Sequence, residues 1–247
     1  MGSSRWTVAL STLFVGALGV PALAETFECM VEPYLEVNLS SAVPGILDQV
    51  NVDRGDRVES GQVLARLRSD LQEAHLELIT ARVKFAERKV LRNEELYRKQ
   101  MISIHEKDEL ETEVQLSKLE LREVEEQLKL RVMQSPLDGV VVDRFYSPGE
   151  FVQEDPIFTL VQIDPLRVEV AVPTRLWGKI QVGMTADVEW ETPVGGVHRA
   201  TVTIVDPVVD AASGTIGVRL ELPNPEHRLP AGAKCSVQFP VAAGLND

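Results

Sequence analysis

The residue types that most often perform chemistry are few and scattered in this chain. Its four histidines, His75, His105, His198 and His227, lie too far apart in sequence to form the closely spaced ligand pair of a metal site. The five methionines do not cluster and offer no soft ligand set. The Gly-x-Ser-x-Gly nucleophile pattern and the phosphate-binding loop are both missing from the sequence. We therefore predict a protein that is not an enzyme, with no catalytic residue and no metal site.

The two cysteines, Cys29 and Cys235, are the remaining candidates for covalent chemistry. They stand near opposite ends of the chain, each in β-type sequence, and their spacing matches no metal-binding motif. In an exported protein two such cysteines can form a disulfide. The alternative is that they serve as two small buried apolar side chains, and the sequence leaves both interpretations open.

The first 24 residues have the three parts of a secretory signal peptide. Arg5 precedes an apolar run over residues 8–20, and the small-x-small pattern Ala22-Leu23-Ala24 follows, so that Glu25 would begin the mature chain. The apolar run is short for a membrane span, although an uncleaved anchor is the alternative. We expect the protein to be exported through this signal.

The charge of the chain limits its partners. The net charge is −13 at pH 7, and removal of Arg5 with the signal peptide would make it −14. A strongly acidic protein repels phosphate backbones. Nucleic acid is therefore not an expected partner.

A long helical segment separates two regions of β-type sequence. Residues 69–132 contain neither glycine nor proline and are rich in Leu, Glu, Lys and Arg. Ser69 and Gln72 predict a capping box at the start of this segment, and Ser103 predicts a second one inside it. Because residues 101–104 also interrupt the charge pattern, we predict two antiparallel helices of about 30 residues each rather than one helix.

Both predicted helices carry side chains at alternating spacings of three and four, the pattern of a coiled-coil seam. The seam predicted for the second helix consists of Leu110, Val114, Ser117, Leu121, Val124, Leu128 and Arg131. The seam predicted for the first helix consists of Leu71, Ala74, Leu78, Ala81, Phe85, Arg88 and Arg92. The first seam becomes charged towards the turn, which predicts a tip that meets a partner.

The β-type segments on either side of the helices repeat each other at a constant offset of 94 residues. Gly45 aligns with Gly139, and Gly55 with Gly149. The same offset aligns Val58 with Val152, Leu64 with Phe158 and Leu67 with Val161. Each half is too small to bury a core alone, so we expect the halves to face each other in one flattened β-sandwich.

These two halves resemble a known family. Residues 41–46 and 55–62 look like the first half of a biotinyl or lipoyl domain, and residues 135–141 and 148–152 look like its second half. A lipoyl-like domain split by a helical hairpin is the layout of the periplasmic membrane fusion proteins, the adaptor subunits of HlyD-like and RND efflux pumps. The resemblance implies an α+β fold in which an antiparallel coiled-coil hairpin is inserted into a split lipoyl-like sandwich, followed by a small antiparallel β-barrel.

No cofactor is expected on the lipoyl-like domain. Lipoyl and biotinyl carriers hold their cofactor on a lysine between the two halves, whereas residues 37–68 and 132–164 contain no lysine. A carrier domain of an enzyme complex is therefore a weaker alternative. A coiled-coil scaffold unconnected with transport is the other alternative.

The C-terminal region alternates in short strands broken by proline and glycine, which predicts the barrel. The chain ends soon afterwards, so we expect no further membrane-proximal domain, and the inner-membrane partner is left open between RND and ABC transporters. The predicted domains are a signal peptide at 1–24, an N-terminal strand joining the barrel at 25–40, the first lipoyl-like half at 41–68, the hairpin at 69–132, the second half at 133–164, the barrel at 165–241 and a tail at 242–247.

Arg92, Leu96 and Ser103 follow the pattern Arg-x3-Leu-x6-Ser, which is similar to the hairpin-tip motif with which efflux adaptors dock onto a TolC-like outer-membrane channel. The resemblance also implies an inner-membrane transporter as partner and a homo-oligomer, a hexamer or a trimer of dimers. Each residue has an ordinary alternative role, Ser103 as a helix cap, Leu96 as a seam residue and Arg92 as a solvated charge.

Overall fold

The computed structural model describes residues 25–191 and 195–240 of the chain. The predicted signal peptide and the predicted tail lie outside these residues. Within them, no helix combines the length and the apolar composition that a membrane crossing requires. The elements are β1 (Thr26–Ser40), β2 (Gly45–Val50), β3 (Arg57–Val58), β4 (Val63–Leu67), α1 (Asp70–Arg98), α2 (Ile104–Lys129), β5 (Val132–Gln134), β6 (Gly139–Arg144), β7 (Phe151–Val152), β8 (Pro156–Pro173), the 3-10 helix η1 (Thr174–Leu176), β9 (Thr185–Trp190), β10 (Val197–Asp210), β11 (Thr215–Leu222) and β12 (Lys234–Gln238).

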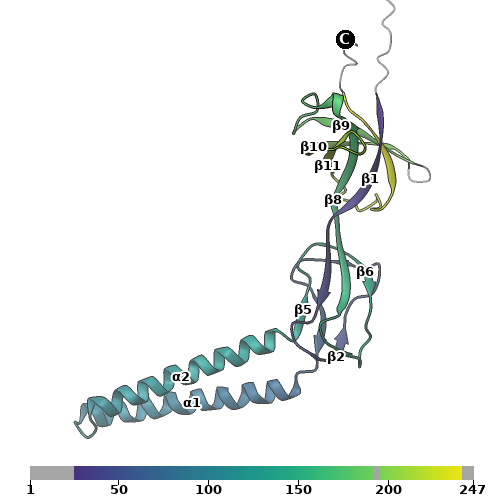
Figure 1. Ribbon diagram of the computed structural model, residues 1–247. Coiled ribbons are helices and arrows are strands. Elements are labelled where there is room, and N and C mark those ends of the chain that lie inside the picture. Colours follow the sequence, from purple (N-terminus) through teal and green to yellow (C-terminus); the bar gives the residue numbers. More distant parts are fainter. Residues whose placement is uncertain (1–24, 192–194, 241–247) are drawn as a thin grey trace, which may run out of the picture.

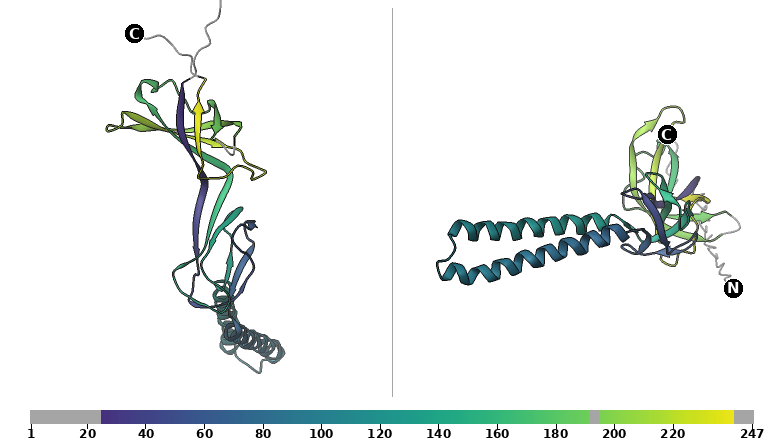
Figure 2. Two further views of the ribbon diagram at one scale, coloured as in Figure 1. Left: turned by 90° about the vertical axis from the view of Figure 1, so that its right-hand side faces the viewer. Right: turned by 90° about the horizontal axis from the view of Figure 1, so that it is seen from below.

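The molecule is elongated, with a barrel at one end, a sandwich in the middle and a helical hairpin that projects sideways from the sandwich (Figure 1). Two long strands connect the barrel to the sandwich, because β1 pairs with β8 from Cys29↔Val170 to Ser40↔Pro156. Strand β8 runs across the boundary that the sequence predicted at residue 164, and β1 already pairs with the sandwich part of β8 before its end at Ser40. The N-terminal strand therefore belongs to the sandwich as well as to the barrel (Figure 2).

The sandwich has the internal symmetry that the 94-residue offset predicts. Strand β3 of the first half pairs with β6 of the second, and β7 of the second half pairs with β2 of the first. The backbone hydrogen bonds repeat in the same way: the Gly55 amide donates to Val141, and the Gly149 amide donates to Leu47. The exchange of short strands buries one shared core, which consists of Leu47, Val52, Val58, Leu64, Ala65, Leu67, Met133, Leu137, Val141, Val152, Ile157, Phe158 and Leu160.

Two kinds of glycine make this close packing possible. Gly55 and Gly149 have φ angles of 92° and 93°, a left-handed conformation that most side chains disfavour. Gly139 is needed for space instead, because a Cβ atom there would overlap the Val161 carbonyl oxygen and lie 2.7 Å from Leu137 Cδ1. Gly55 and Gly149 therefore permit the turns, and Gly139 permits the close packing of strands within the second half.

The barrel closes on itself with six strands in the order β1, β12, β9, β10, β11 and β8, and β8 returns to β1. Alternation of side chains along each strand fills its interior, as in β11, whose pattern places Ile216, Val218, Leu220 and Leu222 inside. Closure leaves no free sheet edge among these strands, which protects the domain from edge-to-edge association.

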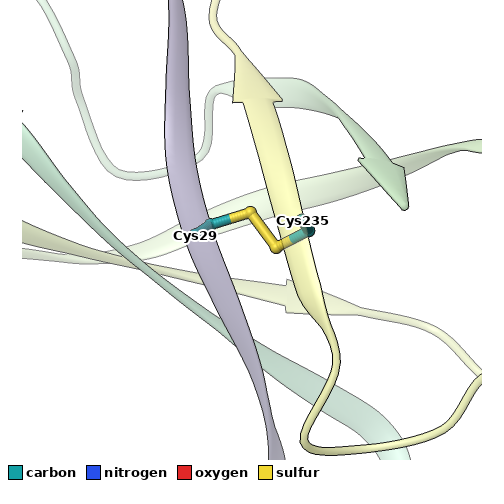
Figure 3. The surroundings of a disulfide bond; sticks show 2 residues. All are labelled: Cys29 and Cys235. Atoms are coloured by element: carbon teal, nitrogen blue, oxygen red, sulfur yellow. A yellow bond between two sulfur atoms is a disulfide. The ribbon is translucent and has the colours of Figure 1, made fainter. Parts of the chain in front are cut away.

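Cys29 and Cys235 lie on the neighbouring strands β1 and β12 and are direct partners in the pairing register. Their Cα atoms are 4.9 Å apart, and the structure joins their sulfur atoms in a disulfide (Figure 3). Both residues are also buried, with exposed fractions of 7% and 3%. The bond links the first strand of the barrel to the last one.

The two helices begin differently. At Ser103 the backbone is extended, with φ −78° and ψ 162°, and a complete capping box with Glu106 is present. At Ser69 the sequence prediction of a capping box is wrong. Its ψ of 6° does not aim the hydroxyl at the first helical amides, and the Ser69 hydroxyl donates instead to the Glu73 carboxylate at 2.6 Å.

The hairpin packs through a seam that the sequence placed correctly on α2 but not on α1. Every α2 position of the predicted seam is buried or half-buried. All seven predicted positions on α1 are exposed. The real α1 seam is displaced by about one residue and consists of Gln72, Leu76, Ile79, Val83, Ala86, Val90, Asn93 and Tyr97, which also follow spacings of three and four.

Candidate functional site

The candidate site is the tip of the hairpin, the point of the helices farthest from the sandwich (Figure 2). Helix α1 ends at Arg98 and α2 begins at Ile104, so five residues form the turn. Gln100 adopts a left-handed φ of 57°, and the Met101 amide donates to the Leu96 carbonyl oxygen at 2.9 Å. This hydrogen bond ends α1 and fixes where the turn leaves the helix.

Arg92 and Leu96 lie on α1 just before the turn. They are four residues apart, so they lie on one face of the helix. Arg92 is exposed and Leu96 is half-buried. Among the residues that the structure describes, Arg92 forms no ion pair, so its guanidinium is available for an external acceptor.

Ser103 has the structural role of a helix cap. Its hydroxyl accepts a hydrogen bond from the Glu106 amide at 3.2 Å, and its own amide donates to the Glu106 carboxylate at 2.8 Å. The hydrogen bonds from the Ser103 amide and hydroxyl to this carboxylate lower the pKa of Glu106. Ser103 is exposed, but its hydroxyl is engaged within the cap. It therefore positions the turn, whereas Arg92 and Leu96 offer the free binding groups.

The end of the hairpin is held in shape by local charge contacts. Lys107 of α2 lies over the Tyr97 ring of α1, with its Nζ 5.0 Å from the ring centroid. Two pairs along α1, Arg98 with Glu94 and Lys99 with Glu95, have N–O distances of 2.8 and 2.9 Å. Exposed ion pairs of this kind each contribute little to the free energy of folding. The contact of Lys107 with the Tyr97 ring joins the two helices and fixes their ends relative to each other.

The structure adds two residues that the docking motif omitted. Met101 in the turn and Ile104 at the start of α2 have exposed fractions of 68% and 56%. They place apolar side chains at the same end as Leu96. The sequence carried a signal for them, because Met and Ile stood in a predicted turn where no core was available to bury them.

The groups exposed at the tip are of the kind that recognise a partner surface. The tip offers the hydrogen-bond donors of one guanidinium and several apolar side chains, which suit recognition of carbonyl or carboxylate oxygens beside an apolar groove. The histidines are not brought together, since His75 and His105 lie on the helices and His198 lies 5.3 Å from the Trp190 ring in the barrel. In residues 25–191 and 195–240, no cluster of three or more His, Cys, Asp or Glu side chains is arranged to hold a metal ion.

Comparison with protein families covers nearly all of the described chain. Residues 36–162 match the CzcB-like barrel-sandwich hybrid domain, and residues 165–243 match the CusB-like β-barrel domain. The division between the two matches falls in the β1–β8 ribbon that joins the sandwich to the barrel.

Two curated relatives and one solved structure illustrate the similarity. Multidrug resistance protein MdtE of Escherichia coli is 25% identical over 229 residues, which cover 81% of this chain and 60% of MdtE. The efflux pump periplasmic linker BepD of Brucella suis is 25% identical over 246 residues, which cover 86% of this chain and 61% of BepD. The crystal structure of a MacA–MexA chimera that contains the Pseudomonas aeruginosa MexA hairpin has a TM-score of 0.76 at 20% identity, over 88% of this chain and 81% of the chimera. The chain spans about half the length of the curated relatives that it matches.

Proposed function

This chain belongs to the membrane fusion protein family of efflux adaptors, and on that premise we propose that it links an inner-membrane transporter to a TolC-like outer-membrane channel for the export of small molecules. Its place of action would be the periplasm, reached through the predicted signal peptide at residues 1–24. The working form would be a homo-oligomer, either a hexamer or a trimer of dimers. Its role would be structural, without a reaction of its own.

The observation that carries the proposal is the position of Arg92. A free guanidinium stands at the far end of a hairpin about 40 Å long, estimated from the 1.5 Å rise per residue of a 29-residue helix. Leu96, Met101 and Ile104 add apolar surface around it. Such an end is suited to insert between helices of a partner, where the guanidinium meets main-chain or carboxylate oxygens.

The arrangement of domains also supports a linking role. The barrel and the hairpin tip are the two extremities of the chain, and the sandwich holds them apart (Figure 1). Because β1 and β8 run through both β-domains, a force applied to the barrel is transmitted along a hydrogen-bonded ribbon rather than through a flexible linker. A protein that binds partners at both ends requires such a connection.

Charge reversal at the tip tests the proposal. We expect Arg92→Asp and Leu96→Ser to reduce efflux-dependent resistance to the level of a strain that lacks the gene, because the docking groups are lost. Both variants should accumulate normally, since Arg92 is exposed and Leu96 is only half-buried at the end of the hairpin, outside the cores of both β-domains. The readouts are the minimal inhibitory concentration of exported compounds, and recovery of the transporter and of the channel by pull-down.

Arg122→Asp is the matched control, because Arg122 is an exposed arginine on α2, away from the tip, and among the described residues it makes no ion pair. It should leave resistance unchanged. Wild-type resistance in both tip variants would contradict the docking proposal and would favour a scaffold unconnected with transport.

A further inference from the structure

The connection between the barrel and the sandwich is narrow. In the described chain, only β1 and β8 run from one domain to the other (Figure 1). Strand β8 pairs with β11 of the barrel as far as Leu166, and with β6 of the sandwich from Val161. Between these points β8 has only β1 beside it among the described strands. A ribbon of two strands bends and twists more easily than a wider sheet.

The pairing within this ribbon is irregular at the same place. Pro33 pairs with Leu166 and Leu35 pairs with Gln162, so Tyr34 of β1 stands opposite the three residues 163–165 of β8. A bulge of this kind leaves backbone groups without partners in the ladder and bends the strand. Residues 163–165 are therefore the point about which the barrel is freest to turn relative to the sandwich.

The loop between β11 and β12 grips this bulge. We call residues 223–233 the strap. Asn224 of the strap is 4% exposed. Its backbone amide donates to Asp164 Oδ1 at 2.7 Å, and its Nδ2 donates to the Ile163 carbonyl oxygen at 3.0 Å. Two of the three bulged residues are therefore held by one buried side chain and its backbone.

The same asparagine holds the strap in shape. Its Nδ2 also donates to the Leu229 carbonyl oxygen at 3.0 Å, and its Oδ1 accepts from the Leu229 amide at 3.1 Å. The His227 amide donates to the Asn224 carbonyl oxygen at 2.9 Å, and His227 has a left-handed φ of 53°. The strap then returns to β1, where the Gly232 amide donates to the Val31 carbonyl oxygen at 2.7 Å. A buried amide whose donors and acceptor are all engaged is costly to displace, so this end of the strap is a lasting anchor.

The strap also contacts the body of the sandwich. Arg57 of β3 donates from Nη2 to the Glu226 carbonyl oxygen at 3.2 Å. Among the hydrogen bonds and ion pairs of residues 25–191 and 195–240, only this one joins the barrel to a part of the sandwich outside β1 and β8. Arg57 is exposed. Because a single exposed hydrogen bond is weak, this end of the strap can be released.

The turn that carries Arg57 does not itself require an arginine. The second half of the sandwich repeats this turn 94 residues further on, and Phe151 stands there in the place of Arg57. Both residues open a two-residue strand that ends in valine, Arg57–Val58 in β3 and Phe151–Val152 in β7. The hydrogen-bond donor is therefore found in the half whose turn meets the strap, which indicates a role between the domains.

We propose that the strap sets the angle between the barrel and the sandwich, with Asn224 as its anchor on the bulge of β8 and Arg57 as its latch on the sandwich. With the latch closed, the two domains turn as one body. With the latch open, the barrel turns about residues 163–165. The inference concerns a connection inside one chain and does not depend on docking by the hairpin tip.

The distance between two spin labels, one in each domain, tests the proposal on the purified full chain. Thr201→Cys on β10 and Arg66→Cys on β4 place the labels at exposed positions away from the strap. Cys29 and Cys235 stay in their disulfide and take up no label. This doubly labelled protein is the parent into which the strap variants are introduced.

Arg57→Ala removes the latch, and Arg54→Ala is its matched control. Arg54 is an exposed arginine of the same turn, and its ion pair with Asp143, at 3.9 Å, stays within the sandwich. We expect one narrow distance distribution in the parent and in Arg54→Ala, and a distribution at least twice as wide, or displaced, in Arg57→Ala. Equal distributions in the two arginine variants would overturn the proposal, and so would a broad distribution in the parent.

Asn224→Ala removes the anchor. Its distribution should be wider than that of Arg57→Ala, because the strap then has no hold on the bulge. Fluorescence of the buried Trp190 shows whether the barrel of this variant is folded. A folded barrel with the narrow distribution of the parent would overturn the proposal, and the two arginine variants decide alone if the barrel does not fold. No partner is present in these measurements, so resistance in Arg92→Asp bears on docking and the distances bear on the strap.

Discussion

Removal of the disulfide between Cys29 and Cys235 should destabilise the barrel far more than the hairpin. The bond joins β1 to β12, the two barrel strands that are farthest apart in the sequence, and the cysteines have a sequence separation of 206. In the unfolded chain it forbids these ends to separate. Replacing both residues by alanine restores that freedom while it keeps the site small and apolar.

The size of the effect follows from the length of the closed loop. A loop of 206 residues corresponds to about 5 kcal/mol of lost chain entropy at 25 °C. If the sandwich remains folded while the barrel opens, β1 and β8 still leave it side by side, and the free loop shortens to roughly 90 residues. The chain entropy depends on the logarithm of the loop length, so the stabilisation by the disulfide falls only to about 4.5 kcal/mol. The prediction is therefore insensitive to the order in which the domains unfold.

Two spectroscopic signals distinguish the domains during unfolding in urea. Of the three tryptophans in the sequence, Trp177 and Trp190 lie in the barrel and Trp6 lies outside the described residues. Trp190 is 3% exposed and pairs directly with Cys235 across β9 and β12, so its fluorescence reports the barrel. Circular dichroism of the helices reports the hairpin. With a urea dependence near 2 kcal/mol per M, the fluorescence midpoint should fall by about 2 M.

Wild-type protein treated with dithiothreitol is the control for the substitutions themselves and should behave as the double alanine variant does. The helical transition should move less than the fluorescence transition. Fluorescence midpoints that are unchanged in both the reduced protein and the double variant would refute the reasoning, because the bond would then restrict nothing in the unfolded chain.

Three further changes test the packing. Ile79→Ala should lower the stability of the hairpin by about 2–4 kcal/mol, because Ile79 is buried in the seam. Leu78→Ala, at an exposed neighbouring position, should change the stability by less than about 0.5 kcal/mol in a dilute monomer. Helical unfolding measures both changes, and equal losses of stability would support the α1 seam first predicted. Gly139→Ala should destabilise the sandwich by several kcal/mol, because backbone must move to admit a Cβ atom, and a normal melting temperature would disprove that. Ser103→Ala should lower stability by about 1 kcal/mol and raise the pKa of Glu106 in part, because the hydroxyl donor is lost while the amide of residue 103, which lowers the pKa most, remains. The low pKa means that the stabilisation from the Glu106 carboxylate is present at neutral pH and is lost as the pH falls through that pKa, which an NMR titration with and without the Ser103 hydroxyl checks.

The helices show how far local sequence determined the outcome. The lack of glycine and proline and the capping box at Ser103 were sufficient to predict two helices and the turn between them, because these signals act within a few residues. The α2 seam was also predictable, since its apolar residues form one main stripe. Helix α1 has two such stripes, and the prediction chose the one with the larger side chains, Leu71, Leu78 and Phe85, which the structure leaves exposed.

Which of the two stripes faces α2 depends on tertiary packing. Ile79, Val83 and Ala86 have a smaller apolar surface than the exposed stripe, but they face α2 in the folded chain, with exposed fractions of 1%, 6% and 2%. The direction in which α1 leaves the sandwich sets which stripe meets α2. No pattern within α1 contains that information, and the same reason explains why the stripe that remains exposed was not recognised from the sequence.

The candidate site was also predictable from the sequence only in part. The spacing of Arg92, Leu96 and Ser103 identified the tip from the sequence, with help from the family resemblance. The structure adds that the Ser103 hydroxyl is used by the cap, while the Arg92 guanidinium forms no ion pair among the described residues. It also placed Met101 and Ile104 at the same end.

The repeat at an offset of 94, the helical hairpin and the number of β-regions could be predicted from the chain alone, because each depends on residue types close together in the chain. Long-range packing was needed to establish that β1 and β8 continue through both β-domains, that Cys29 lies opposite Cys235, and which face of α1 is covered. These features depend on pairing between segments more than 100 residues apart or on the angle at which an element leaves its neighbour. Local propensity and periodicity do not specify distant strand pairing or the angle at which an element leaves its neighbour.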